Sequence, residues 1–287
     1  MSSESSSESS SEVSFLVFDI ESVADSALVS LVRDAGAKTP QDSLAEYRKE
    51  LMEKKGTDFV PYAYHVPISL ALAKVRPDYS LLDLTVLKVE DGGPRKLCER
   101  FWNGWRYYKR PQFVTFNGRG FDIPLMELTA FRYGVPLADW FDDQKPSYLQ
   151  NRNRYSGAHL DLYDFLTNFG ATSIVGGLNL VAKLLRKPGK IETKGSMVQD
   201  LTNAGELDEI HAYCRCDVLD TYFVFLRASV IRGKITAKDE SELIERTRKF
   251  LEERQNEIPV YREYLEAWET NVGFFKKNEC FPFTLEN

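Results

Sequence analysis

Cysteine and histidine are scarce in this chain, and long apolar runs are missing. The 287 residues contain four cysteines and three histidines. Cys214 and Cys216 are separated by a single residue, which is too close for the usual spacing of paired zinc ligands. No apolar run approaches the ~18 residues of a transmembrane helix, and the N-terminus lacks the basic start and apolar stretch of a signal peptide. We therefore expect a cytoplasmic protein with free thiols and no membrane contact.

The formal net charge of −6 argues at first against a nucleic-acid partner, but this charge is unevenly distributed. Residues 1–12 are almost entirely serine and glutamate, and Glu4, Glu8 and Glu12 account for half of the net charge. A segment with so little apolar surface does not fold, so we expect a disordered tail over residues 1–12. The remaining body is closer to neutral, which leaves room for a local basic groove.

The rest of the chain is expected to form one large domain with appendages, because 43% of the residues are hydrophobic. Residues 26–56 are expected to form an insertion, helical in its second half, between the first two strands. Antiparallel strands followed by alternating helix and strand favour a mixed sheet covered by helices. Apolar patterns predict strands over residues 13–20, 66–75 and 81–89, and helices over residues 96–108, 178–185 and 206–232.

A C-terminal extension is predicted over residues 234–287. Apolar side chains recur at helical spacing over residues 238–255 and again over residues 260–270. We expect these two helices to pack on the core of the domain. A partner-binding module is the alternative interpretation.

The first candidate site lies at the end of the first predicted strand, in the run Val-Phe-Asp-Ile-Glu at residues 17–21. Side chains alternate faces along a strand, so Asp19 and Glu21 point the same way. Two neighbouring carboxylates are costly to bury unless a proton or a cation neutralises them. A hard divalent cation would do so, since it prefers oxygen ligands. Taken alone, however, the pattern favours a strand-end pair that caps a turn.

The second candidate site is a short apolar strand, a turn with two glycines and the start of a helix, at residues 113–125. Asp122 stands at the helix entrance, where the pattern taken alone favours an N-cap. The glycines could let a nucleic-acid backbone or a metal site come close. Asn117 could hydrogen-bond a ligand or tie down its own turn.

The histidines and the basic loop at residues 186–195 are ambiguous. No second ligand stands at metal-binding spacing from His65, His159 or His211, so we expect each to be a hydrogen-bonded structural residue. Asp161 is expected to cap a helix or to support a site residue. The lysines and arginine of the basic loop fit either a solvated surface loop or a phosphate-facing one.

The third candidate site lies within the long helix predicted over residues 206–232. Tyr213 and Asp217 are four residues apart and therefore share a face of that helix. The alternative is a core tyrosine beside a surface acid. That alternative weakens when the three candidate sites are considered together, because a helix that turns a phenol and a carboxylate toward its sheet is unusual.

The three candidate sites resemble the three motifs of DEDD-type 3′–5′ exonucleases, in the variant with a tyrosine. The matching segments are Phe-Asp-Ile-Glu at 18–21, Asn-x-x-x-Phe-Asp at 117–122 and Tyr-Cys-x-x-Asp at 213–217. The likeness is greatest to the proofreading exonuclease domain of family B DNA polymerases, and in particular to its free-standing predicted relatives. It covers about residues 13–232 and implies an exonuclease domain over residues 13–233. Ser22 departs from the polymerase pattern, which usually has threonine there.

The resemblance implies an α/β fold of the ribonuclease-H-like type, with a five-stranded mixed sheet flanked by helices. It also implies two Mg²⁺ or Mn²⁺ ions, held by Asp19, Glu21, Asp122 and Asp217. Asp19 would bridge both ions, Glu21 and Asp217 would hold the ion that carries the attacking water, and Asp122 would hold the other. Tyr213 would orient that water, since a free phenol has a pKa near ~10 and is a poor base.

The substrate implied by the resemblance is single-stranded nucleic acid with a free 3′ end, DNA by preference, which would be degraded to nucleoside 5′-monophosphates. An exoribonuclease is an alternative, because the same four carboxylates serve both sugars. A catalytically silent nucleic-acid-binding module is another, although the complete carboxylate set argues against it. The residues expected to contact substrate are Asn117, Phe121, Lys190 and Lys194.

Overall fold

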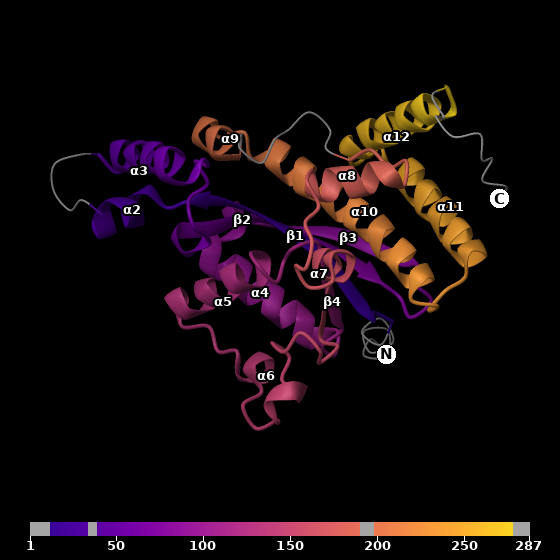
Figure 1. Cartoon of the computed structure of the whole chain (residues 1–287), viewed down its shortest axis with the longest axis horizontal. Helices are drawn as coiled ribbons and strands as arrows, with labels where there is room; N and C mark the ends of the chain where they lie inside the picture. The colour runs from indigo at the N-terminus through magenta and orange to yellow at the C-terminus, as the bar shows by residue number, and fades with distance from the viewer. Residues whose placement is uncertain (1–11, 34–38, 190–197, 278–287) are drawn as a thin grey trace, which may run out of the picture.

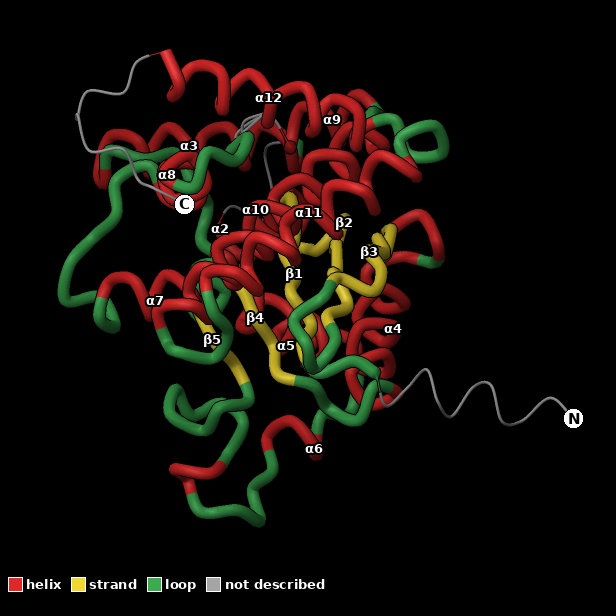
Figure 2. The backbone as a smooth tube through the Cα atoms, turned by 90° about the vertical axis from the view of Figure 1, so that its right-hand side faces the viewer, coloured by secondary structure: helices red, strands yellow, loops and turns green. Residues whose placement is uncertain are grey.

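A computed structural model of the chain describes residues 12–33, 39–189 and 198–277. Five strands form one sheet in the order β3-β2-β1-β4-β5, and helices cover both of its faces (Figures 1 and 2). β2 is antiparallel to β1 and β3, while β4 is parallel to β1 and to β5. The strands are β1 (Phe15–Ala24), β2 (His65–Val75), β3 (Leu81–Lys88), β4 (Gln112–Thr115) and β5 (His159–Asp161). This order and mixed direction confirm the predicted ribonuclease-H-like sheet.

The helices agree with most of the predictions. Four features were not predicted: the first helix of the insertion between β1 and β2, the short helices over residues 138–141 and 198–204, and the start, at residue 93 instead of 96, of the helix predicted over residues 96–108. The region after residue 159 forms a three-residue strand and then a helix. The helices are α2 (Ser26–Arg33), α3 (Pro40–Lys55), α4 (Gly93–Tyr107), α5 (Asp122–Tyr133), α6 (Ala138–Phe141), α7 (Leu162–Thr167), α8 (Gly177–Leu184), α9 (Val198–Ala204), α10 (Leu207–Ile231), α11 (Ala237–Arg254) and α12 (Val260–Lys277).

The sheet separates two hydrophobic cores. On one face, the core is formed by β1, β2, β3 and α10, with Val218 and Tyr222 of α10 fully buried. On the other face, α4 contributes Phe101 and Trp105, which pack against Phe113 of β4. Burial of large aromatic side chains on both faces is strongly stabilising. It makes the sheet a rigid support for anything carried by its central strand.

The C-terminal helices share the α10 core. Figure 1 shows α11 and α12 on the outer side of α10. Tyr261 and Tyr264 of α12 and Leu251 of α11 are fully buried in the cluster that contains α10. Residues 1–11 of the predicted tail lie outside the described residues. Among the described helices, none combines the length and the apolar character that crossing a membrane requires.

Candidate active site

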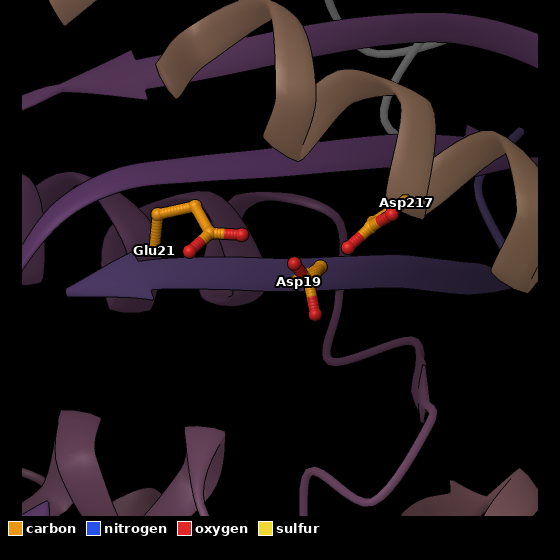
Figure 3. A group of neighbouring side chains, drawn as sticks. All are labelled: Asp19, Glu21 and Asp217. Atoms are coloured by element: carbon orange, nitrogen blue, oxygen red, sulfur yellow. The ribbon is translucent and has the colours of Figure 1, made fainter. Parts of the chain in front are cut away.

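Three carboxylates from two elements come together beside the central strand. Asp19 and Glu21 project from β1, and Asp217 projects from α10 (Figure 3). Each offers a carboxylate oxygen, and these oxygens all lie within 4.8 Å of one another. Asp217 is buried, whereas Asp19 and Glu21 are half-buried. The structure thus groups three of the four carboxylates that the sequence predicted as metal ligands.

Strand geometry explains why these side chains meet. Val17 of β1 packs in the core shared with α10, while Phe18 and Ile20 pack on the opposite face. Alternation therefore directs Asp19 and Glu21 toward α10. β4 pairs with β1 only as far as Val17. The edge of β1 beyond that point is open to side chains from other segments.

A histidine fixes the first turns of α10 next to this group. The Nδ1 atom of His211 lies 2.8 Å from the Ser69 hydroxyl, and its Nε2 atom lies 2.7 Å from a Glu90 carboxylate oxygen. Ser69 is the β2 residue paired with Glu21. His65 and His159 are also hydrogen-bonded, the former to Ser22 and Val60 and the latter to Thr115. All three histidines therefore have the structural role that the sequence predicted.

Tyr213 is buried beside the three carboxylates. Burial raises the pKa of its phenol well above the usual value, and the charges of Asp217, Glu21 and Asp19 raise the pKa further. The raised pKa favours the protonated phenol in the metal-free site, where it is hydrogen-bonded to Asp217. The orienting role implied by the resemblance stays a prediction.

Asp122 lies against the same strand but does not belong to the group of three. It is the first residue of α5, and Phe121 stands at the N-cap position without a side-chain cap, so the interpretation of Asp122 as an N-cap was wrong. Its carboxylate is hydrogen-bonded by the backbone of Ile20, between Asp19 and Glu21. Burial, and then the charge of Asp161, raise the pKa of Asp122 to about 7.

The turn before Asp122 is held by Asp161. The Asp161 carboxylate accepts hydrogen bonds from the backbone amides of Asn117 at 2.9 Å and Arg119 at 2.8 Å, and it also caps α7 through the amide of Tyr163. Gly118 completes the turn, because a Cβ atom there would lie 2.5 Å from the Thr115 hydroxyl oxygen. The cap predicted for Asp161 is therefore present, and so is the predicted support of site residues, because Asp161 also holds the turn that carries Asn117 and Asp122.

The predicted substrate residues have different environments. Asn117 is exposed on the turn, with a left-handed φ of 66°. Phe121 is half-buried, and its ring lies 5.7 Å from that of His65 and 5.8 Å from that of Phe59. Lys190 and Lys194 lie outside the described residues.

Lys187 itself fits neither interpretation of the basic loop. Its side chain is neither solvated nor available to a phosphate, because only 5% of the residue is exposed. The ammonium lies 3.6 Å from the centre of the Trp268 ring and 4.4 Å from that of Phe223. These rings favour the charged form, whereas burial lowers the pKa of Lys187 to about 7. The aromatic partners come from α10 and α12, which the loop sequence cannot reveal.

Sequence reasoning missed Asp220, which continues the stripe of Tyr213 and Asp217 along α10. It is fully buried, and Oδ1 accepts a 2.6 Å hydrogen bond from the Tyr264 hydroxyl. Its other oxygen has no hydrogen-bond partner among the described residues. Burial raises the pKa of Asp220 to about 8. The spacing of three residues from Asp217 could have placed Asp220 on this stripe, but its partner comes from distant α12.

A family model described as a predicted 3′-5′ exonuclease related to the exonuclease domain of PolB matches residues 57–268. That span contains Asp122, Tyr213 and Asp217, whereas Asp19 and Glu21 precede it. Among solved structures, the chain is similar to the family B DNA polymerase from the hyperthermophilic archaeon Pyrobaculum calidifontis, at 15% identity and a TM-score of 0.45. The similarity covers 76% of this chain and 24% of the polymerase chain. No curated protein matches the chain.

Proposed function

Because the chain belongs to the family of predicted 3′-5′ exonucleases related to the exonuclease domain of PolB, we propose that it removes nucleotides from the 3′ end of single-stranded nucleic acid. DNA is the proposed substrate, and nucleoside 5′-monophosphates are the proposed products. The observation that carries the proposal is the group of Asp19, Glu21 and Asp217 beside the protonated phenol of Tyr213. A purely structural role would not explain three carboxylates brought together against their own repulsion.

The donor set fits a hard divalent cation. Asp19, Glu21 and Asp217 offer only carboxylate oxygens, within 4.8 Å of one another, and such ligands suit Mg²⁺ or Mn²⁺. These three residues would hold one ion, and Asp122, at the start of α5 and hydrogen-bonded by the backbone of Ile20, would help to hold a second. When bound, a pair of such ions neutralises the phosphate charge and activates a water for attack.

The protein's own groups then orient the reactants. The Tyr213 hydroxyl is hydrogen-bonded to Asp217 and would turn to donate to the attacking water, which aligns that water with the scissile phosphate. The turn from Asn117 to Asp122 lies on the other side of the site. It is held in place by the hydrogen bonds that its backbone amides donate to Asp161. Asn117 is exposed on that turn, and we propose that it contacts the nucleic-acid strand.

The proposal is tested with 20-nucleotide DNA and RNA single strands that carry a label at the 5′ end. Each is incubated with Mg²⁺, with Mn²⁺ and with EDTA. We expect a ladder that shortens stepwise from the 3′ end on DNA, with either metal and not with EDTA. Faster degradation of RNA would make the protein an exoribonuclease. Intact strands under every condition, with binding retained, would favour a silent binding module and contradict the proposed activity.

A further inference from the structure

Two exposed aromatic rings and an arginine form a surface patch beyond the candidate active site. Tyr155 precedes β5 and is 74% exposed, and Phe169 follows α7 and is 45% exposed. Their ring centres lie 5.7 Å apart, and the Arg154 guanidinium lies 5.4 Å from the centre of the Phe169 ring. We refer to Arg154, Tyr155 and Phe169 as the stacking patch.

The backbone holds these rings outward. Phe169 has a φ of 58°, and its neighbour Asn168 has a φ of 52°. This left-handed conformation is unfavourable for a bulky residue. It is fixed by a 2.7 Å hydrogen bond from the Phe169 amide to the Asp164 carbonyl. On the other side, the Tyr155 amide donates to the Asn153 side chain at 2.8 Å. Asn168 caps the C-terminus of α7, and the conformation leaves the Phe169 ring 45% exposed. An exposed ring held in an unfavourable conformation is typical of a binding surface.

The patch has the chemistry of a single-strand binding surface. Unpaired bases stack on exposed aromatic side chains, and a guanidinium attracts the phosphates between them. Arg154 is exposed and pairs with no carboxylate within the part of the chain that the structure describes. Duplex bases are already stacked on one another and offer no free faces, so the patch selects unpaired strands.

The position of the patch relative to the site follows from α7. This helix is capped by Asp161, which holds the turn beside Asp122, and it ends directly before Asn168 and Phe169. Six residues of helix span about 9 Å. Figure 2 shows the loops around β5 and α7 gathered on the same side of the molecule. Phe169 therefore lies about the length of this short helix from Asp161, a span that a few nucleotides of single strand can cover.

We propose that Arg154, Tyr155 and Phe169 bind the unpaired substrate strand on the 5′ side of the nucleotide that is removed. The proposal rests on the proposed function, and it adds a binding surface outside the three motifs. The patch contributes affinity for long strands and leaves the chemistry at the carboxylates unchanged.

The test measures strand binding apart from cleavage. Fluorescence anisotropy of a labelled 15-nucleotide thymidine strand is recorded with Asp19→Asn protein, which leaves the strand intact. Added to this background, Tyr155→Ala and Phe169→Ala should each raise Kd about tenfold, the usual order for loss of one stacking ring. Phe169→Tyr keeps a ring and should restore binding. Phe131→Ala is the matched control, because Phe131 is an 84% exposed aromatic residue on α5.

A second readout separates this proposal from the proposed function. The p-nitrophenyl ester of thymidine 5′-monophosphate reaches only the carboxylates, so the patch variants on the otherwise wild-type chain should hydrolyse it with unchanged kcat/KM. If both alanine variants bind the 15-nucleotide strand with unchanged Kd, the stacking patch does not bind the substrate strand. A protein partner would then be the remaining ligand for this surface. An equal loss with Phe131→Ala would also overturn the proposal. A wild-type protein that cleaves neither substrate would refute the proposed function, while anisotropy would still report on the patch.

Discussion

The thiol of Cys214 donates to the backbone carbonyl of Asp19 at 3.4 Å and thereby fixes α10 against the strand that carries two of the carboxylates. Cys214 is buried, and burial raises the pKa of its thiol well above the usual value, so the thiol remains a donor. It directly follows Tyr213 and stands one helical turn before Asp217. Together with the hydrogen bond between His211 and Ser69, this contact holds α10 against the strands beside the carboxylates.

Neutralising one carboxylate should stabilise the protein when metal is absent. Asp19→Asn removes one of three neighbouring negative charges, so we expect a rise of a few degrees in Tm in EDTA. Added Mn²⁺ should raise the Tm of the wild type more than that of the variant, since ligand binding stabilises the folded state. Scanning calorimetry measures both effects. A variant that melts below the wild type in EDTA would mean that Asp19 makes a stabilising contact instead.

Tyr213→Phe separates orientation from metal binding. The ring keeps its packing and the carboxylates are untouched, so the affinity for Mn²⁺ should not change. Turnover should fall by about 10²-fold, the lower end of the range for groups that act in the chemical step. Calorimetric titration gives the affinity, and single-turnover cleavage gives the rate. If the variant cleaves at the wild-type rate, Tyr213 is only a core tyrosine.

Gly118→Ala should disrupt the turn that ends at Asp122. The new Cβ atom would lie 2.5–2.8 Å from atoms of the Thr115 side chain, which cannot move because Thr115 is buried and bonded to His159. Overpacking of this kind costs about 1–3 kcal/mol. Gly120→Ala is the control, since its Cβ atom would lie 3.4 Å from its nearest neighbour. Urea denaturation of both variants is the measurement, and equal stability would contradict the tight turn.

The free energy of unfolding should decrease as the pH is lowered, because His159 is buried. Burial, with the charge of Arg119, lowers the pKa of this histidine to about 3 in the folded state, against ~6.5 in the unfolded chain. Below ~6.5 the unfolded chain binds a proton that folded His159 does not, so stability declines as pH falls, by at most ~1.4 kcal/mol per pH unit. His159→Gln should flatten the dependence of unfolding free energy on pH between about 6.5 and 4.5. An unchanged slope would show that His159 titrates normally.

Local patterns predicted most of the site. Alternation along β1 fixed the common face of Asp19 and Glu21, and helical spacing fixed the common face of Tyr213 and Asp217. Each of these two predictions needs only the regular geometry of one strand or one helix, which the spacing of residues in the sequence reveals.

The features that were missed depend on contacts between distant segments. Asp122 lies outside the group of three carboxylates and is hydrogen-bonded by the backbone of Ile20, which belongs to a distant segment. Lys187 is buried because Trp268, on α12, covers it. Both contacts join residues that are far apart in the sequence, so neither has a local signal. For this reason the sequence predicted a solvated or phosphate-facing loop around Lys187.

The grouped carboxylates are proposed to carry out metal-dependent cleavage. A comparison of asparagine variants at two carboxylates of α10 tests this most directly. Asp217 belongs to the group, whereas Asp208 is exposed in the first turn of α10 and pairs with Lys88. Single-turnover cleavage of a 5′-labelled strand is measured over a Mn²⁺ titration for both asparagine variants. We expect Asp217→Asn to lose about 10²–10⁴-fold in rate and to need more metal, while Asp208→Asn cleaves as the wild type does. Wild-type cleavage by folded Asp217→Asn would contradict the account.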